Sequence, residues 1–541
     1  MSLGNYDREK SGFSESDVAE SQKGVSRRAI MRGAAWTVPA VMLSTVAPAY
    51  AASLSCNANT YSTIGRGKLV SGSVFSLNLD TLVSVNGVRA KSPAPQGTEI
   101  GFDSDGSTGD YDEFANTLSI TALQAIQIDA TGLTNGTVTP ILSDLLPANA
   151  GAHSQYSYAA SEGLSKGAAG VVVDNGDVAL TPNATYPDFG TLELKTLLTP
   201  LLGGNDAAFI AANVANLRLQ IGAVAGRARW DVCANPALLT RDYLVNHLRL
   251  VIDSGLLVTL TDLISTTLTA SLSALLLAGT VVIDSTVITN GSNGAPQPTG
   301  ANPSLPIPGG STQPIQANLG STTTANGIAP GTIVIDLSTL MGSAATNPFG
   351  ASAQPFLNGA PANSILFVDT SFAVPGSAIA DFIGALPSTP GGTDGYGLQG
   401  ELWSRLLDAI WISIGGFTGT LRTALSSNNI LVQGVVNTVL GALNALFATV
   451  LTAILTVTLP AVFSTVFGWL TNVINITLNV QNVPEANNNP TTAVAHPGPA
   501  AWNFAPRYDV AAIGVNALSA IPSGLLALYL ARGSVGPNAA L

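Results

Sequence analysis

The chain has 541 residues, of which only 10% are Asp, Glu, Lys or Arg, and its formal net charge is −12. Ordinary soluble domains carry roughly 25% charged residues, so solubility must rest largely on hydroxyl and amide side chains. The shortage of Lys and Arg excludes binding to a nucleic-acid backbone, which requires clustered cations.

The N-terminal stretch has the organisation of an export signal. It contains a basic pair, an uncharged run and a small-x-small cleavage site, formed by Arg27, Arg28, residues 33–46, Ala49 and Ala51. The run of roughly 15 residues is too short to cross a bilayer as a stable helix, and the arginine pair indicates the twin-arginine route. We therefore predict a leader and signal peptide over residues 1–51 and an extracytoplasmic mature protein. A retained membrane anchor is the alternative interpretation.

Only two cysteines occur, Cys56 and Cys233, and both follow the predicted cleavage site. In an oxidising compartment they form one disulfide that closes a long loop, or they remain two unpaired thiols. Both alternatives stay open at this point.

Residues 52–289 are predicted to form a β-rich region with one long helix. Two Asn-Gly pairs between apolar runs, at Asn86-Gly87 and Asn175-Gly176, predict tight hairpin turns. Alternation of apolar and polar residues over 217–223 predicts a half-buried strand. Leucines spaced mostly three to five residues apart predict an amphipathic helix over residues 255–277.

One segment of this region is strongly acidic and is our candidate metal site. Its five carboxylates belong to Asp103, Asp105, Asp110, Asp112 and Glu113. Carboxylates at alternate positions on a Gly-containing loop supply the hard oxygens that calcium prefers, although the EF-hand spacing is not met. The alternative interpretation is a solvated acidic loop, and calcium is the only cofactor that the sequence suggests.

Residues 290–330 are rich in Pro, Gly and Asn and carry no charge, which predicts a linker or a long loop. The similar segments that flank it, 279–284 and 331–336, suggest two strands of one sheet. The remaining region, 331–541, is predicted to be α+β.

Two helical segments are expected within 331–541. The first covers residues 401–414, with Glu401 and Arg405 one turn apart. The second is the charge-free segment 423–484, for which we predict a buried helical hairpin that breaks at Pro460. Membrane insertion of this segment is the alternative, because residues 440–459 are apolar; the threonines in the run and the missing flanking cations argue against it.

No catalytic constellation emerges, and we predict that the protein is not an enzyme. The run Gly163-Leu164-Ser165-Lys166-Gly167 fits G-x-S-x-G, but a nucleophile elbow needs a helix after the serine, and a strand is expected there. The three histidines lack the paired spacing of a zinc site. Arg227 and Arg229 beside Trp230 suggest either an anion or sugar site, or a solvated strand face.

Several short blocks resemble the actinobacterial choice-of-anchor G surface proteins. They include residues 71–73, 77–80, 86–88, 155–163, 168–171, 240–243, 479–481 and 535–540, in the expected order. The resemblance implies an exported cell-surface protein without established activity. Members of that family end in different anchoring signals, and no such signal follows residues 535–540 here, so covalent attachment is not expected.

Together these patterns predict a β-rich α+β protein with sandwich-like antiparallel sheets and long apolar or amphipathic helices. The predicted role is a cell-surface structural or interaction protein, such as a surface-layer component, cell-wall coat or adhesin. Its expected partners are other copies of itself or cell-envelope components. The alternatives are an extracellular hydrolase or carbohydrate-binding protein, and a membrane-inserted or pore-forming protein built on 423–484.

Overall fold

The structure is a computed structural model, and its description covers the greater part of the chain after residue 55. The described residues are 56, 59–74, 77–81, 86–93, 95, 97–106, 109–117, 127–128, 139–140, 142–143, 153–178, 190–195, 204–234, 237–290, 315–319, 328–340, 356–358, 360–369, 376–389, 395, 397–482, 499, 502, 506–517 and 526–541. The predicted export residues Arg27, Arg28, Ala49 and Ala51 lie outside them.

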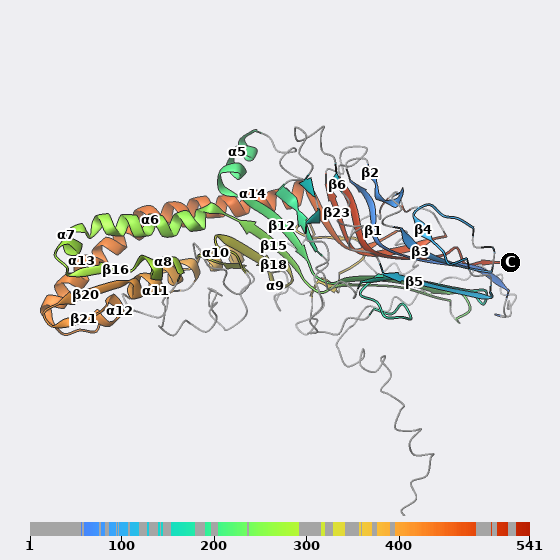
Figure 1. Cartoon of the computed structure of the whole chain (residues 1–541), viewed down its shortest axis with the longest axis horizontal. Helices are drawn as coiled ribbons and strands as arrows, with labels where there is room; N and C mark the ends of the chain where they lie inside the picture. Colours follow the sequence, from blue (N-terminus) through green and yellow to red (C-terminus); the bar gives the residue numbers. More distant parts are fainter. Residues whose placement is uncertain are drawn as a thin grey trace, which may run out of the picture.

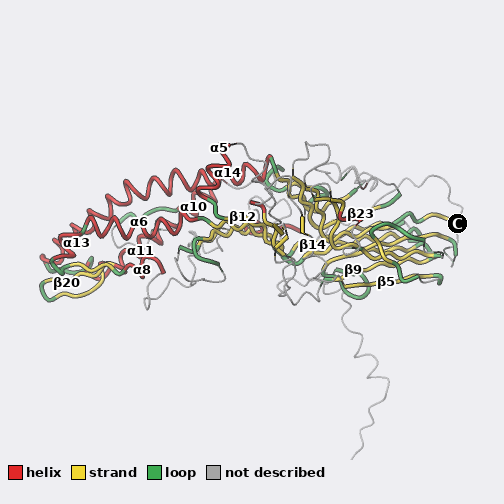
Figure 2. The backbone as a smooth tube through the Cα atoms, turned by 45° about the horizontal axis from the view of Figure 1, so that its top comes forward, coloured by secondary structure: helices red, strands yellow, loops and turns green. Residues whose placement is uncertain are grey.

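The fold is α+β and rich in antiparallel sheet, as predicted, and the molecule is elongated (Figure 1). One end is a body of strands that contains the C-terminus. The other end is an arm of helices that ends in a small sheet. A further sheet lies between the body and the arm. Figure 2 shows the same division by secondary structure.

The largest sheet has nine strands and joins the beginning of the described chain to its end. Its main path runs β19-β22-β23-β24-β1-β3-β4, and β2 and β25 pair with β1. Pairing of β1 with β24 extends from Gly65 opposite Val535 to Val74 opposite Leu526. The bounds are β1 Tyr61–Val74, β2 Leu77–Asn78, β3 Gly87–Ser92, β4 Phe102–Asp103, β19 Ser364–Ile365, β22 Ile474–Gln481, β23 Tyr508–Ala517, β24 Leu526–Val535 and β25 Ala539–Ala540.

A five-stranded antiparallel sheet packs against the nine-stranded one. Its order is β14-β13-β10-β9-β5. The bounds are β5 Tyr111–Thr117, β9 Ser154–Ala160, β10 Leu164–Gly170, β13 Val224–Asp231 and β14 Leu238–Val245. A Cβ atom on Gly167 of β10 would lie 2.0 Å from the carbonyl oxygen of Arg66 on β1, and one on Gly226 of β13 would lie 2.0 Å from that of Ala531 on β24. The two sheets therefore meet backbone to backbone at these positions, closer than the usual spacing of about 10 Å.

The sheet between body and arm has six strands in the order β17-β18-β15-β12-β11-β8. The bounds are β8 Leu142–Ser143, β11 Gly190–Glu193, β12 Asn216–Ile221, β15 Leu248–Asp253, β17 Ile315–Ala317 and β18 Thr332–Asp336. The alternation predicted at 217–223 is confirmed as far as Ile221, where β12 ends, because Leu217, Leu219 and Ile221 are buried while the residues between them are half-buried. A separate two-stranded pair consists of β6 Gln127–Ile128 and β7 Thr139–Pro140.

The arm is built on two long helices and ends in a three-stranded sheet of order β16-β20-β21. The predicted helix over 255–277 is confirmed, with a break at Leu272; Ser254 caps its start by accepting a hydrogen bond from the Leu256 N–H. The arm elements are α6 Gly255–Ser271, α7 Ser273–Leu277, β16 Val281–Ile283, α8 Ser285–Asn290, α11 Gly397–Ala409, β20 Ile410–Ile414, β21 Phe417–Thr420, α12 Leu421–Ala424, α13 Ile430–Leu446, η6 Phe447–Leu451, η7 Ala453–Thr458 and α14 Leu459–Asn472.

The remaining short elements border the sheets. They are η1 Leu79–Thr81, α5 Gly204–Asn213, α9 Leu337–Leu340, η4 Phe356–Asn358 and α10 Gly376–Ile383. One apolar core cluster continues from the nine-stranded sheet through the six-stranded sheet into the arm.

The predicted helical hairpin over 423–484 is wrong, because residues 430–472 form one continuous helix. The predicted break at Pro460 does not occur, since π-helical turns in η6 and η7 precede it and the proline occupies the first turn of α14. Hydrogen bonds to a carbonyl five residues earlier change the register, so the missing N–H and the proline ring are tolerated. The strand β22 follows directly.

Other element boundaries also differ from the sequence predictions. Residues 410–414, predicted as the end of a helix, form β20, because their alternating apolar residues pair with β16 and β21. Gly87 is the first residue of β3 and pairs in parallel with Phe102 of β4, so Asn86-Gly87 is not the predicted tight turn. The second Asn-Gly turn is confirmed, in minimal form, by an antiparallel bridge between Val172 and Val178.

The segments that flank the predicted linker do not share a sheet. β16 lies in the three-stranded sheet of the arm, whereas β18 pairs with β15 in the six-stranded sheet. β17 lies inside the predicted linker 290–330 and also pairs with β18. Strand pairing therefore crosses the predicted division between 52–289 and 331–541.

Candidate functional site

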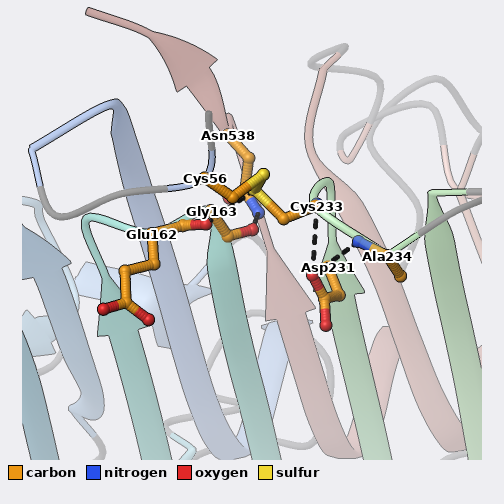
Figure 3. The surroundings of a disulfide bond; sticks show 7 residues. All are labelled: Cys56, Glu162, Gly163, Asp231, Cys233, Ala234 and Asn538. Atoms are coloured by element: carbon orange, nitrogen blue, oxygen red, sulfur yellow. Dashed lines mark hydrogen bonds between the residues drawn. A yellow bond between two sulfur atoms is a disulfide. The ribbon is translucent and has the colours of Figure 1, made fainter. Parts of the chain in front are cut away.

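A disulfide lies at the body end of the molecule, near the C-terminus (Figure 3). Cys56 before β1 is bonded to Cys233 in the turn after β13, with Cα atoms 5.8 Å apart and 177 positions between them in sequence. The Asp231 carboxylate accepts hydrogen bonds from the N–H groups of Cys233 at 3.2 Å and Ala234 at 3.1 Å, which fixes the turn. Of the two sequence alternatives, the structure has the paired form.

Ser165, the centre of the G-x-S-x-G match, lies inside β10 and is fully buried. Its hydroxyl donates a 2.9 Å hydrogen bond to the Asn538 side chain, which in turn donates to the carbonyl of Gly163 at 3.1 Å and to that of Trp230 at 3.2 Å. A nucleophile elbow requires an exposed serine at a strand-to-helix turn. Ser165 instead fixes the C-terminal segment to the five-stranded sheet.

The structure does not bring the carboxylates of the predicted calcium loop together. Among the described residues no group of three or more His, Cys, Asp or Glu side chains could hold a metal ion. The five predicted ligands are Asp103, Asp105, Asp110, Asp112 and Glu113. Asp112 is buried and accepts from the Lys91 N–H, whereas Glu113, its neighbour on β5, accepts from the Tyr156 hydroxyl. Successive strand residues point to opposite faces, so these carboxylates cannot converge.

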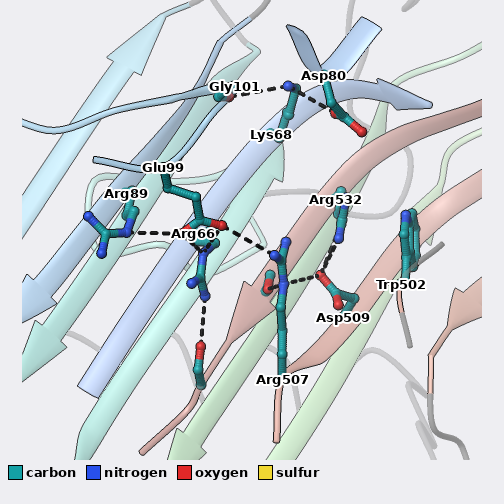
Figure 4. A network of polar contacts seen from close by, with 12 residues as sticks. Arg66, Lys68, Asp80, Arg89, Glu99, Gly101, Trp502, Arg507, Asp509 and Arg532 are labelled. Atoms are coloured by element: carbon teal, nitrogen blue, oxygen red, sulfur yellow. Dashed lines mark hydrogen bonds and ion pairs between the residues drawn. The ribbon is translucent and has the colours of Figure 1, made fainter. Parts of the chain in front are cut away.

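The main polar cluster in the body is a network of buried charges (Figure 4). Glu99 bridges three guanidinium groups, with N–O distances of 2.7 Å to Arg66, 3.0 Å to Arg89 and 3.3 Å to Arg507. Asp509 on β23 bridges Arg507 at 3.2 Å and Arg532 on β24 at 2.9 Å. Lys68 on β1 pairs with Asp80 at 3.0 Å. The network thus connects β1, β3, β23 and β24 to the segment before β4.

Burial and charge act in opposite directions on these groups. Burial alone would raise the pKa of Asp509, but Arg507 and Arg532 outweigh it, so the pKa of this carboxyl lies below its ordinary value. Burial lowers the pKa of Arg66 to about 10, aided by Arg507 and opposed by Glu99. Glu99 and Asp509 each compensate more than one cation.

Aromatic rings cover the cations of the network. The Arg532 guanidinium lies 4.1 Å from the ring centre of Trp502, and Lys68 and Arg507 lie 5.3 Å and 5.9 Å from that of Phe102. Such a paired network holds strands in register.

Sequence reasoning missed this network, although one signal was present. Basic residues are rare in the chain, and Arg66 and Lys68 stand at alternate positions of a strand-like segment. The arginines considered as a ligand site behave similarly: Arg227 binds the carboxylates of Asp242 and Asp177, and Arg229 pairs with Asp231 at 3.5 Å. The anion or sugar site is therefore not supported.

The free end of the arm carries the largest gathering of exposed apolar side chains. We define the distal tip as residues 273–283 and 410–431. Within the described residues, five of the eleven large hydrophobic side chains that are exposed belong to it, namely Leu277, Val282, Trp411, Ile430 and Leu431. Exposed fractions reach 90% at Leu277 and 84% at Ile430. Clusters of this kind mark interaction surfaces in soluble proteins.

Behind the tip, the long helix exposes a face of small and hydroxyl-bearing residues without any charge. Its threonine hydroxyls donate to carbonyls of the same helix, as in Thr449 to Ala445 at 2.6 Å and Thr456 to Thr452 at 2.7 Å. The same bond occurs on α6, from Thr266 to Asp262 at 2.8 Å. Such side chains satisfy their donors internally and turn methyl groups outward.

The helix over residues 430–472 is also the one described segment that is long and apolar enough to cross a membrane. Its other face carries Leu443, Phe463 and Trp469, which are buried in the common core. These contacts fit the core helix of a folded arm.

Comparison with known proteins gives one match. A family described as "Domain of unknown function (DUF8394)" matches residues 65–374 and 404–536, which include the body, the central sheet and most of the arm. No curated protein and no solved structure matches the chain.

Proposed function

This chain belongs to the family described as a domain of unknown function (DUF8394), and we propose that it is an exported cell-surface structural or interaction protein. The observation that carries the proposal is the difference between the two ends of the molecule. A disulfide-closed body occupies one end, and an arm with an exposed apolar tip occupies the other. A disulfide is favoured outside the cytoplasm, and an exposed apolar surface serves to make contacts.

The side chains that suggested catalysis or ligand binding support this proposal, because both make contacts within the fold. Ser165 is buried in a strand, and Arg227 is bound by two carboxylates. The protein is proposed to act by holding contacts at the cell envelope, as a surface-layer component, coat protein or adhesin.

Cell fractionation tests this function. Mature protein is expected in the envelope fraction, on the surface, or in the medium after loss of residues 1–51. Replacing Arg27 and Arg28 together by lysine should leave precursor in the cytoplasm, whereas Arg32→Lys, also in the basic region, serves as the matched control. Unchanged export of the double variant would refute the twin-arginine route, and mature protein confined to the cytoplasm would refute the proposed function.

A membrane-inserted protein is a second candidate, favoured by the length and composition of residues 430–472. Extraction of envelopes with alkaline carbonate separates the two. The cell-surface proposal expects release of the protein, because the buried face of this helix packs on the protein core. Retention after carbonate would favour the spanning alternative.

A further inference from the structure

The distal tip brings together two chain segments that are distant in sequence, 273–283 and 410–431. Val282 on β16 and Trp411 on β20 are direct pairing partners, so their side chains share the outer face of the small sheet. Leu431 lies against the turn between β20 and β21, since a Cβ atom on Gly415 would be 3.3 Å from its Cδ1 atom. Leu277 ends the short helix that leads into β16. The exposed apolar residues therefore form the end cap of the arm.

The charges of the arm stop at the base of this cap. Arg422 is the only charged residue in the tip as defined, and it is neutralised by Asp408, 2.6 Å away at the end of α11. Asp284 lies at the same level, because its N–H donates to the Ala409 carbonyl at 2.8 Å. Beyond this level the chain continues as an extended hairpin from Ile410 to Gly415, which spans about 20 Å at ~3.3 Å per residue.

The polar groups within the cap are paired with one another. The hydroxyls of Ser413 and Thr418 lie 3.2 Å apart across the hairpin, and Asn429 donates to the Gly415 carbonyl at 3.4 Å and accepts from the Leu431 N–H at 2.9 Å. These contacts lower the cost of moving this part of the cap out of water, while burial of its apolar side chains is favourable.

We propose that the distal tip inserts into the outer leaflet of a lipid layer, to the depth set by Asp284 and Asp408. One leaflet is about 15 Å of hydrocarbon, half of the ~30 Å core, which the uncharged cap can fill without crossing the bilayer. The cap has no net charge, so hydrocarbon rather than anionic headgroups is the complementary partner. This inference deepens the proposed function, on which it rests, by naming what the surface protein attaches to.

A second copy of the chain fits the tip less well. The other exposed large apolar side chains among the described residues come from separate segments of the chain, for example Ile100, Leu238 and Val368. Fluid hydrocarbon adapts to the free end of an arm without a matching groove. The net charge of −12 also opposes the approach of two copies.

Flotation of the purified full-length mature chain with phosphatidylcholine vesicles tests the proposal. The triple variant Leu277→Gln, Trp411→Gln and Ile430→Gln changes only exposed side chains, and its partition into vesicles should fall by about a hundredfold or more. The matched control Ile100→Gln with Val457→Gln also removes exposed apolar side chains, 80% and 65% accessible, but away from the tip, and should bind like the wild type. Circular dichroism verifies that all three proteins are folded.

The dependence of vesicle binding on lipid composition and on salt concentration provides a second test. Binding to phosphatidylcholine should not change with salt, and adding phosphatidylglycerol should weaken it at low salt, since the protein is acidic. Absence of wild-type flotation, or equal loss in triple and control variants, would overturn the proposal. So would wild-type dimers that the triple variant abolishes, which would make the tip a contact between copies. Because the assay uses purified protein, its failure is distinguishable from failure of export or surface location.

Discussion

At the scale of single residues, the most consequential groups are buried charges in a chain that has few charges. Glu99 and Asp509 each pair with more than one guanidinium, so the loss of either carboxylate deprives at least two cations of a partner. Breaking a buried pair by removing one partner leaves an uncompensated charge in a low dielectric. Exposed charges, by contrast, contribute little.

Asp509→Asn is therefore expected to lower the free energy of unfolding by about 3–5 kcal/mol, because Arg507 and Arg532 lose their shared carboxylate. Urea denaturation measures the loss. The control Asp262→Asn, on the exposed face of α6, should change stability by less than about 0.5 kcal/mol. A similar effect of the two substitutions would show that the network does not stabilise the sheet.

His153, immediately before β9, leads us to expect that the stability of the fold depends on pH. Burial lowers its pKa from 6.5 to about 4, so between these values the unfolded chain binds a proton that the folded chain does not. The free energy of unfolding should consequently fall as the pH decreases through this window. We expect His153 to lower it by about 2–3 kcal/mol at pH ~4.5 relative to pH ~7. Urea denaturation of His153→Gln at both pH values should show a smaller acid loss than the wild type. Identical losses in both proteins would contradict the assignment.

At the scale of elements, sequence patterns predicted those helices that depend on interactions between residues close in sequence. The leucine period identified α6, and the i,i+4 pair Glu401–Arg405, 2.8 Å apart, lies on a helix as expected. Residues 410–414 continue the predicted helix without a stop signal, and pairing with β16 and β21 makes them a strand. The continuous helix through Pro460 depends on π-helical turns, which no residue pattern signals.

For the candidate sites, the sequence likewise identified individual residues but not their arrangement in space. Cys56 and Cys233 were identifiable as candidates because they are the only cysteines, but their pairing depends on the fold. The acidic residues were conspicuous, yet β5 directs its neighbouring carboxylates to opposite faces. The distal tip escaped prediction because Leu277, Trp411 and Ile430 are each ordinary apolar residues until the arm brings them to one end.

The contact between the two sheets of the body gives a prediction at this scale. Gly167→Ala would place a Cβ atom 2.0 Å from the Arg66 carbonyl oxygen and 2.3 Å from that of Ser534, so both strands of the facing sheet must move. We expect a loss of about 3 kcal/mol or more in the free energy of unfolding. Thermal denaturation of the purified variant measures it.

Gly434→Ala is the matched control, because it makes the same substitution on the exposed side of α13, where nothing lies within 4 Å of the new Cβ atom. Alanine has the higher helix propensity, so this variant should gain about 0.5–1 kcal/mol. Opposite signs for the two substitutions are the expected result. A mild effect at Gly167 would mean that the sheets are farther apart than described.

At the scale of the whole molecule, two features lie at opposite ends. The disulfide lies at the end of the body, and the exposed apolar side chains of the distal tip lie at the end of the arm. The disulfide joins the segment before β1 to the turn after β13, across 177 positions. Closing a loop of this length removes conformational freedom from the unfolded chain, and such bonds contribute about 2–5 kcal/mol. It acts at the body end, whereas the tip is held by the arm's own core.

Cys56→Ser and Cys233→Ser should each lower the free energy of unfolding by about 2–5 kcal/mol, and the double variant should lose no more than either single one, because all three lack the same bond. Urea denaturation under oxidising conditions measures this, and the wild type in reducing buffer should match the variants. Vesicle flotation of the folded variants should remain that of the wild type, since the disulfide lies at the opposite end from the tip. Additive losses in the double variant would show that the cysteines contribute separately, and lost flotation would show that the two ends are coupled.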